Sequence, residues 1–324
     1  QVGGLTLLLY ADGAVGWYDA AAGIQWYCVA WDGGQPLVTA FALMDAQSYT
    51  VPTAPEGAAV QAYLDKRQIR KSIAVRFGMG ASPDRWDGLL TAMTRKGYSK
   101  QELLAAGLVV NGRNGRLYDK FRNRLMLPVI DTRGDVVGFG SRVIDNSEPK
   151  YMNTTETITY SKRRILYGLN LAKKTKRPNI ILCEGNLDVV TLHQAGFDNA
   201  VASMGTALTV EQTRLLSRFT KELVLCYDND NAGKIATERA LQILNGSEFS
   251  VKVLQLPRRL VDGEYIKQDA DDFIKFQGPD AFERLLNGSE NGVEFRMAQI
   301  AGKYDLKDDE ARIAYCGEVS ELLA

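Results

Sequence analysis

The sequence predicts an α/β chain, α+β overall, whose second half contains a doubly wound and mostly parallel sheet. Acidic residues follow the ends of the predicted strands, and a strongly basic segment precedes them. Apolar runs alternate with amphipathic stretches, which is typical of strands joined by helices. The predicted strands lie at 180–183, 200–204, 223–227 and 251–256, and the predicted helices at 187–195, 209–219 and 233–244. Each crossover is expected to be right-handed.

Composition indicates an ordinary globular chain. Its 324 residues are 45% hydrophobic and 24% charged, with a net charge of zero, which suits more than one small domain. Neither an 18-residue apolar run nor an Arg-rich transit peptide is recognisable, so we expect a cytoplasmic protein without a membrane span. The cysteines are too scattered for a zinc site, and we expect reduced core thiols. They are Cys28, Cys183, Cys226 and Cys316.

Residues 1–56 form an atypical N-terminal segment. It contains no Lys or Arg, the first cation of the chain being Lys66, and it is rich in Ala, Gly, Trp and Tyr. Either a divergent α/β extension or a frame-shifted stretch would account for it. Aromatic residues in such a segment are more often core than stacking platforms, so Trp17, Trp26 and Trp31 are given no function.

The next segment, 57–178, has the charge of a nucleic-acid surface. Between residues 113 and 177 there are 15 Lys and Arg residues against 6 Asp and Glu residues, a net charge of +9 in a neutral chain. Such asymmetry predicts a binding groove. Arg122 and Arg124 alternate on entry to one predicted strand, and Arg142 follows GFGS on another. The run 173–177 is expected to be a solvated face.

Three acidic groups are expected at strand ends in the second half. Glu184 ends the strand of ILCEG, and Asp188 lies in the first turn of the following helix, so both can face one point. Asp228 and Asp230 follow LVLCY, and a period of two places them on one side of an extended chain. A lone acid there is usually a cap, but gathered carboxylates are typical of magnesium sites. The third group is Asp269 and Asp271 in QDADDF.

The surroundings of the second acidic group suit an anionic substrate. Asn231, Ala232 and Gly233 open a predicted helix that carries Lys234, so backbone N–H groups and a cation lie near the acids. His193, the only histidine, is expected to face away from the acids as a packing or surface residue.

These motifs resemble known families. A glutamate ending one strand, a D-x-D ending a later one and a third acidic group resemble the TOPRIM fold, a Rossmann-like metal-binding module of primases, topoisomerases and some nucleases. FRNRLMLPVIDTRGDVVGFGSRVI, followed by EPKYMNTTET and SKRRILYGL, closely resembles the RNA polymerase core of bacterial DnaG-type replicative primases. EGNLDVVTLHQAGFDNAVASMGTALT resembles the same family's signature, except that Asn186 stands where an aromatic residue is common. The resemblance runs from about Gly57 to the C-terminus.

The resemblance implies a DNA primase catalytic core, a nucleotidyltransferase of the primosome that makes short RNA primers on single-stranded DNA from ribonucleoside triphosphates. Two or more Mg²⁺ or Mn²⁺ ions would be held by six acids: Glu184, Asp188, Asp228, Asp230, Asp269 and Asp271. Three of these acids would also be catalytic, namely Glu184, Asp228 and Asp230. The implied template, primer or nucleotide contacts are Arg67, Lys120, Arg122, Arg124, Arg142, Lys150, Asn153 and Lys162.

The resemblance also implies three subdomains: a basic mixed α+β one at 57–178, the TOPRIM sheet at 179–277 and a small helical one at 278–324. The family's zinc-binding domain and its domain that engages the replicative helicase are not visible. We therefore expect an isolated catalytic core without zinc, acting at the bacterial nucleoid.

Two other classes of protein remain open. A TOPRIM nuclease or topoisomerase would share the acids, although a topoisomerase also needs a nucleophilic Tyr in a further large domain. A noncatalytic module that binds single-stranded DNA would explain the basic segment. It would leave the acids unexplained, because without metal they repel phosphate.

Overall fold

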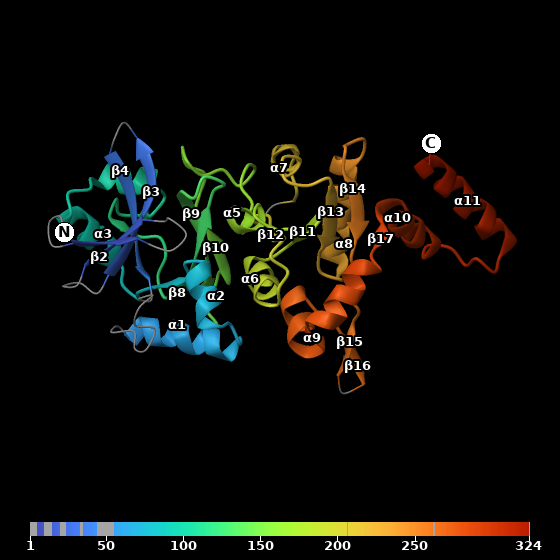
Figure 1. Cartoon of the computed structure of the whole chain (residues 1–324), viewed down its shortest axis with the longest axis horizontal. Helices are drawn as coiled ribbons and strands as arrows, with labels where there is room; N and C mark the ends of the chain where they lie inside the picture. The colour runs from blue at the N-terminus through green and yellow to red at the C-terminus, as the bar shows by residue number, and fades with distance from the viewer. Residues whose placement is uncertain are drawn as a thin grey trace. The chain divides into compact units, whose positions relative to one another are not determined.

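The computed structural model describes side chains for residues 57–205, 207–261, 263–289 and 291–322; elsewhere it gives only the backbone of assigned strands and helix ends. The chain forms two compact units (Figure 1). The first unit comprises Gln1–Thr175 and Gly185–Thr206, and the second comprises Lys176–Glu184 and Ala207–Ala324. Four residues interpreted from the sequence lie outside the residues whose side chains are described: Trp17, Trp26, Trp31 and Cys28.

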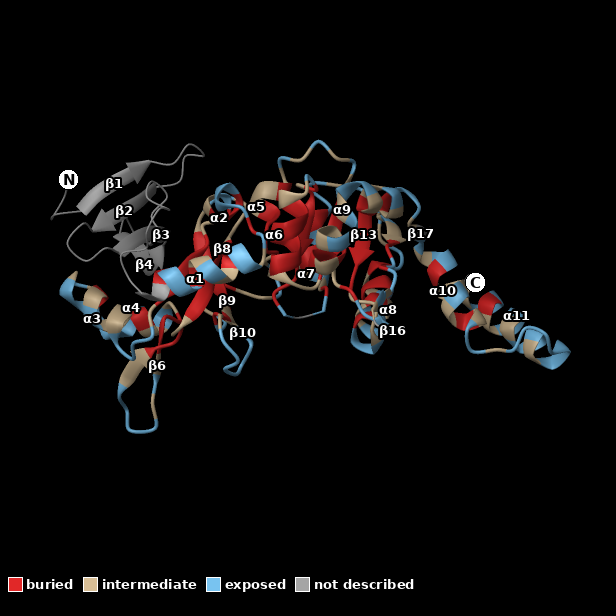
Figure 2. Ribbon diagram, turned by 90° about the horizontal axis from the view of Figure 1, so that it is seen from below, coloured by how far each residue is buried: buried red, intermediate tan, exposed pale blue. Residues whose placement is uncertain are grey.

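An antiparallel sheet of eight strands forms the centre of the first unit, in the order β1, β2, β3, β4, β5, β8, β9, β10. Strands β8 and β9, next to the edge strand β10, are buried along nearly their whole length (Figure 2), which explains their almost continuous apolar sequence. The strands are β1 (Leu5–Leu9), β2 (Val15–Asp19), β3 (Ile24–Asp32), β4 (Gln35–Leu43), β5 (Gly80–Ser82), β8 (Arg124–Ile130), β9 (Val136–Val143) and β10 (Tyr151–Asn153).

Short helices and a hairpin complete the first unit. They are α1 (Pro55–Lys66), α2 (Lys71–Arg76), α3 (Gly88–Arg95), α4 (Lys100–Ala105), α5 (Leu169–Ala172), α6 (Asn186–Gln194), β6 (Val109–Asn111), β7 (Leu117–Asp119) and β12 (Ala200–Ala202). α4 begins with a capping box in which the Ser99 hydroxyl accepts from the Glu102 N–H, an arrangement that satisfies free N–H groups of the first turn. Met93 and Leu103 of α3 and α4 pack against Met126 and Phe139 of the sheet.

The second unit is built on parallel strands. β11 (Asn179–Cys183), β13 (Glu222–Cys226) and β14 (Ser250–Val253) lie side by side in parallel, and β17 (Glu290–Asn291) pairs antiparallel with β14. The other elements are α7 (Val210–Leu216), α8 (Asn231–Leu244), a hairpin of β15 (Arg259–Val261) and β16 (Glu264–Ile266), α9 (Ala270–Asn287), α10 (Gly292–Ala301) and α11 (Asp309–Leu323). Among the helices described, none is long and apolar enough to cross a membrane.

The predicted α/β class and βα alternation are confirmed, with two corrections. Asp269 and Asp271 do not follow a strand of the parallel sheet, because the separate β15–β16 hairpin comes between β14 and α9. Cys183 and Cys226 are buried thiols as expected, but Cys316 is exposed on α11 and is not a core residue.

Candidate metal site and basic surface

Glu184 and Asp228 meet where two parallel strands end. The register pairs Cys183 with Cys226, so the residues that follow β11 and β13 emerge at one edge of the sheet. There the Asp228 backbone N–H donates a hydrogen bond to Glu184 Oε1 at 3.1 Å. The strand ends thus place two of the predicted acids together.

Asp228 and Asp230 face a common point, as the spacing predicted. The Lys267 ammonium lies 2.8 Å from Asp230 Oδ2 and 3.4 Å from Asp228 Oδ2. Asp230 also caps α8, accepting from the Gly233 N–H at 2.9 Å. A Cβ at Gly233 would fall 1.9 Å from the Asp228 carbonyl oxygen, so glycine is required for α8 to begin this close to the acids.

The third acidic group has three members. Carboxylate oxygens of Asp269, Asp271 and Asp272 all lie within 4.8 Å of one another. Asp269 caps α9 by accepting from the Asp272 N–H at 2.7 Å, and buried Asp271 pairs with Lys275 at 2.5 Å. Sequence reasoning missed Asp272, although it continues the acidic run QDADDF, and it missed both lysines.

Burial governs the ionisation of these acids. It raises the pKa of Glu184, an effect that the Asp228 carboxylate increases, and it also raises the pKa of Asp228 and Asp269. The hydrogen bond from Lys267 instead lowers the pKa of Asp230. Half-buried carboxylates that lie close together disfavour their own charge and offer only oxygen ligands, which suits a hard divalent cation. The residues therefore fit the metal that the TOPRIM resemblance implies.

Asp188 belongs to the first unit. It is buried in the first turn of α6, where its Oδ2 accepts from the Gly185 N–H at 3.1 Å. Asn186, two residues before Asp188, packs against Gly140 of β9. A Cβ added at Gly140 would lie only 2.6 Å from Asn186 Nδ2, so the glycine leaves the space that the Asn186 amide occupies.

Three of the predicted cations gather around two tyrosines in the first unit. The Arg142 guanidinium lies 4.9 Å from the centre of the Tyr151 ring and 5.7 Å from that of Tyr63. Arg67 lies 5.5 Å from the Tyr63 ring, and Lys150 lies 5.8 Å from the Tyr151 ring. We call these five residues the tyrosine cluster. No sequence pattern singled out the tyrosines, apart from their place near predicted cations.

A second arrangement of the same kind holds Arg122. Its guanidinium lies 4.2 Å from the ring of Trp86 and 5.0 Å from that of Tyr118, and it donates a hydrogen bond to the Asp119 carbonyl. Trp86 is 66% exposed. A stacked guanidinium beside an exposed indole offers both charge and a flat apolar face, the two elements of single-strand binding.

Among the remaining predicted contacts, Lys120 and Arg124 are buried, whereas Asn153 and Lys162 are half-buried. Desolvation, with repulsion from Lys162, lowers the pKa of Lys120 to about 8. Burial also lowers the pKa of Arg124, whose Nη1 has no hydrogen-bond partner among the described residues. Asn153 Nδ2 donates to the Met204 carbonyl at 3.2 Å. Burying a positive charge is unfavourable unless it is paired, so an anion beside Lys120 and Arg124 would offset the cost of their desolvation.

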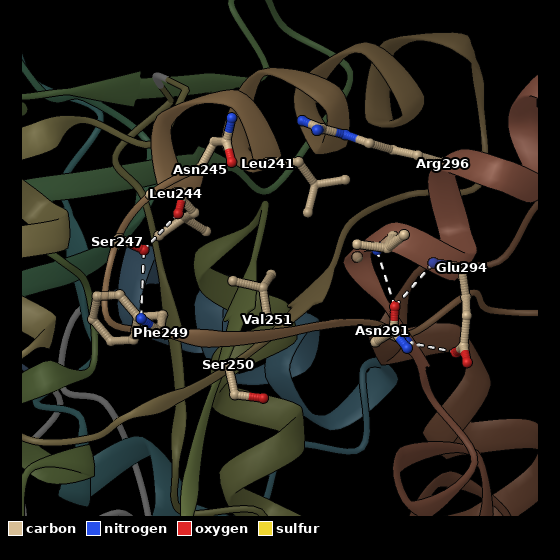
Figure 3. A pocket seen from close by; sticks show the side chains of 13 residues that line it. Leu241, Leu244, Asn245, Ser247, Phe249, Ser250, Val251, Asn291, Glu294 and Arg296 are labelled. Carbon is tan, nitrogen blue, oxygen red and sulfur yellow. Dashed lines mark hydrogen bonds between the residues drawn. The ribbon is translucent and has the colours of Figure 1, made fainter. Parts of the chain in front are cut away.

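One pocket of the second unit lies apart from these groups. It has a volume of about 540 Å³ and opens between the end of α8, β14 and the start of α10 (Figure 3). Leu241, Phe249 and Arg296 are among its lining residues, and none of the predicted acids lines it. The acids are therefore not part of this pocket.

Comparison with protein families assigns both halves of the chain. Residues 49–173 match the family described as DNA primase catalytic core, N-terminal domain. Residues 181–274 match the family described as Toprim-like, a family that implies dependence on a divalent metal.

Curated relatives and solved structures agree with this assignment. The DNA primase of Clostridium acetobutylicum is 40% identical over 281 residues, which cover 86% of this chain and 46% of the relative, and that of Escherichia coli K12 is 36% identical over 80% of this chain and 44% of the relative. The chain thus spans less than half the length of these relatives.

Among solved structures, the E. coli primase catalytic core has a TM-score of 0.71 at 35% identity and covers 83% of this chain and 84% of its own. A DnaG primase catalytic domain bound to single-stranded DNA has a TM-score of 0.70 at 34% identity, covering 81% of each chain. The chain belongs to the family of DnaG-type primase catalytic cores.

Proposed function

We propose that this chain synthesises short RNA primers on a single-stranded DNA template from ribonucleoside triphosphates. The convergence of Glu184, Asp228 and Asp230 at one sheet edge carries the proposal. Family membership supports it, and so does the DnaG relative solved with single-stranded DNA.

The acids are proposed to hold two or more Mg²⁺ or Mn²⁺ ions. Glu184, Asp228 and Asp230 would be the central ligands, and Asp188, Asp269 and Asp271 would complete the set. When bound, such ions favour attack by the primer 3′-hydroxyl and offset the charge that develops at the α-phosphate. The protein's own part is to hold the carboxylates in place, which the strand ends and the caps of α8 and α9 do.

The basic residues are proposed to bind the template, the primer and the incoming nucleotide. The guanidinium groups of Arg122 and Arg142 lie over aromatic rings, so each site presents a positive charge next to an aromatic surface. Such a combination binds single strands of any base sequence. The other proposed contacts are Arg67, Lys120, Arg124, Lys150, Asn153 and Lys162.

The proposed division of labour follows the expected subdomains, with 57–178 binding nucleic acid, 179–277 holding metal and 278–324 completing the core. The chain spans less than half the length of its curated relatives. A replicative helicase is proposed as a partner, engaged through a C-terminal domain that is not among these 324 residues. The working place would be the bacterial nucleoid, where the template lies.

The test is primer synthesis by wild type and Glu184→Gln on single-stranded template with ribonucleotides and Mn²⁺. The variant should lose labelled RNA and keep template binding, because it removes a metal ligand and no phosphate contact. Glu222→Gln is the matched control, since Glu222 lies at the opposite end of β13 and pairs with Lys252.

RNA synthesis by Glu184→Gln at the wild-type rate would refute the assignment of the metal site. Shortened template in place of RNA would indicate a TOPRIM nuclease. Retained DNA binding with neither product would indicate a noncatalytic binding module.

A further inference from the structure

Lys267 stands between two of the proposed metal ligands. Its ammonium lies 2.8 Å from Asp230 Oδ2 and 3.4 Å from Asp228 Oδ2. The side chains of the two aspartates are 36% and 24% exposed, and that of the lysine is 58% exposed. One positive charge therefore bridges two carboxylates from the solvent side.

A positive charge at this place offsets the repulsion between the acids. Glu184, which accepts from the Asp228 N–H, adds a third carboxylate to the same strand ends. Carboxylates held this close repel one another unless a cation or a proton neutralises them. An ammonium group is compact and carries three donors, so Lys267 can bond to both Asp228 and Asp230 at once.

The chain that carries Lys267 is lightly held. It directly follows β16, and in the β15–β16 hairpin Leu260 is 58% exposed and Tyr265 is 68% exposed. The hairpin is closed at its base, where buried Gln268 donates to the Pro257 carbonyl at 2.8 Å. All three residues of β16 are exposed, whereas β15 packs through the Arg259 guanidinium, which lies 3.6 Å from the centre of the Phe276 ring. The exposed Lys267 side chain can therefore leave the aspartates while buried Gln268 stays anchored.

We propose that Lys267 is a resident counter-ion that takes the place of a divalent cation in the metal-free chain and is displaced when the metal binds. Lys267 is thus a positioning residue: it keeps Asp228 and Asp230 facing one point before metal arrives, and it lowers the affinity for metal by competing with it. This inference rests on the metal site of the proposed function.

The expected size of the competition follows from exposure. Half-exposed ion pairs contribute little, and the measured range for such pairs corresponds to a change of roughly 1.5- to 5-fold in an equilibrium constant. Lys267→Met should therefore bind Mn²⁺ roughly 1.5- to 5-fold more tightly than wild type. In EDTA the same variant should unfold at a lower temperature than wild type, because the aspartates have lost their counter-ion.

The experiment titrates the whole chain with Mn²⁺ by calorimetry and records thermal unfolding in EDTA. Tighter metal binding together with a lower metal-free stability is a combination that simple damage to the fold does not produce. Lys267→Arg should return both values toward wild type. Lys252→Met is the control, because it removes a comparable ion pair with Glu222, at 3.2 Å, from the other end of β13, and should leave the Mn²⁺ affinity unchanged.

The possible failures are distinguishable. If wild type binds Mn²⁺ and Lys267→Met binds it with the same affinity, the counter-ion role is wrong while the metal site stands. If wild type binds no Mn²⁺, both this inference and the proposed metal site fail.

Discussion

Acid should destabilise this chain through His193. The imidazole lies on α6 with only 4% of the residue exposed, its Nε2 is 2.9 Å from the Ala200 carbonyl oxygen, and the Phe77 ring meets it edge-on at 5.0 Å. Because the carbonyl only accepts, Nε2–H is the donor. Desolvation lowers the pKa of His193 to about 4, against about 6.5 in an unfolded chain.

The sign and size follow from linkage. Since the folded-state pKa lies below the unfolded one, the contribution of His193 is complete above pH 6.5 and is lost as the pH falls toward 4, where the unfolded chain binds the extra proton. A difference of about 2.5 pKa units corresponds to a loss of about 2 kcal/mol between pH 7 and pH 5, and about 3.4 kcal/mol at the limit.

The measurement is urea unfolding of wild type and His193→Gln at pH 7 and pH 5. The Gln amide can still donate to the Ala200 carbonyl but does not titrate. On going from pH 7 to pH 5, the free energy of unfolding of the variant should rise by about 2 kcal/mol relative to that of wild type. The metal-site carboxylates titrate in both proteins and cancel in this difference. Equal pH dependence of the two proteins would refute the reasoning.

Three further outcomes are expected. Gly233→Ala places a Cβ 1.9 Å from the Asp228 carbonyl oxygen, and the resulting shift of about 1 Å should lower primer synthesis by roughly 100-fold; synthesis at the wild-type rate would contradict this. Glu184→Gln and Asp228→Asn should be nonadditive, because ligands of one site fail together, and additive rate losses in the double variant would indicate separate roles. Arg142→Ala should reduce the log–log salt slope of single-stranded DNA binding by roughly 0.7, whereas Lys221→Ala, which removes a remote surface pair with Glu248, should not; equal slopes for Arg142→Ala and wild type would exclude a phosphate contact.

Much of this molecule could be predicted from local patterns. The alternation of apolar and amphipathic stretches predicted β11, α6, β13 and α8, since the periods of strands and helices are properties of the chain itself. The two-residue spacing of Asp228 and Asp230 predicted that they face one point, and Lys267 bridges both. The unbalanced charge of 113–177 predicted where cations gather, although not what they touch.

Tertiary structure alone decided the partners of these groups. Lys267 reaches Asp228 across 39 residues of sequence, and Tyr63 meets Arg142 from a different element; no local period encodes such contacts. The sequence likewise predicted Asp269 at the end of a strand of the parallel sheet. In the structure Asp269 follows the separate β15–β16 hairpin and caps the N-terminus of α9. Periodicity is fixed by the geometry of neighbouring residues along the chain. Which side chain neutralises a buried charge depends on distances that exist only after distant segments have packed together.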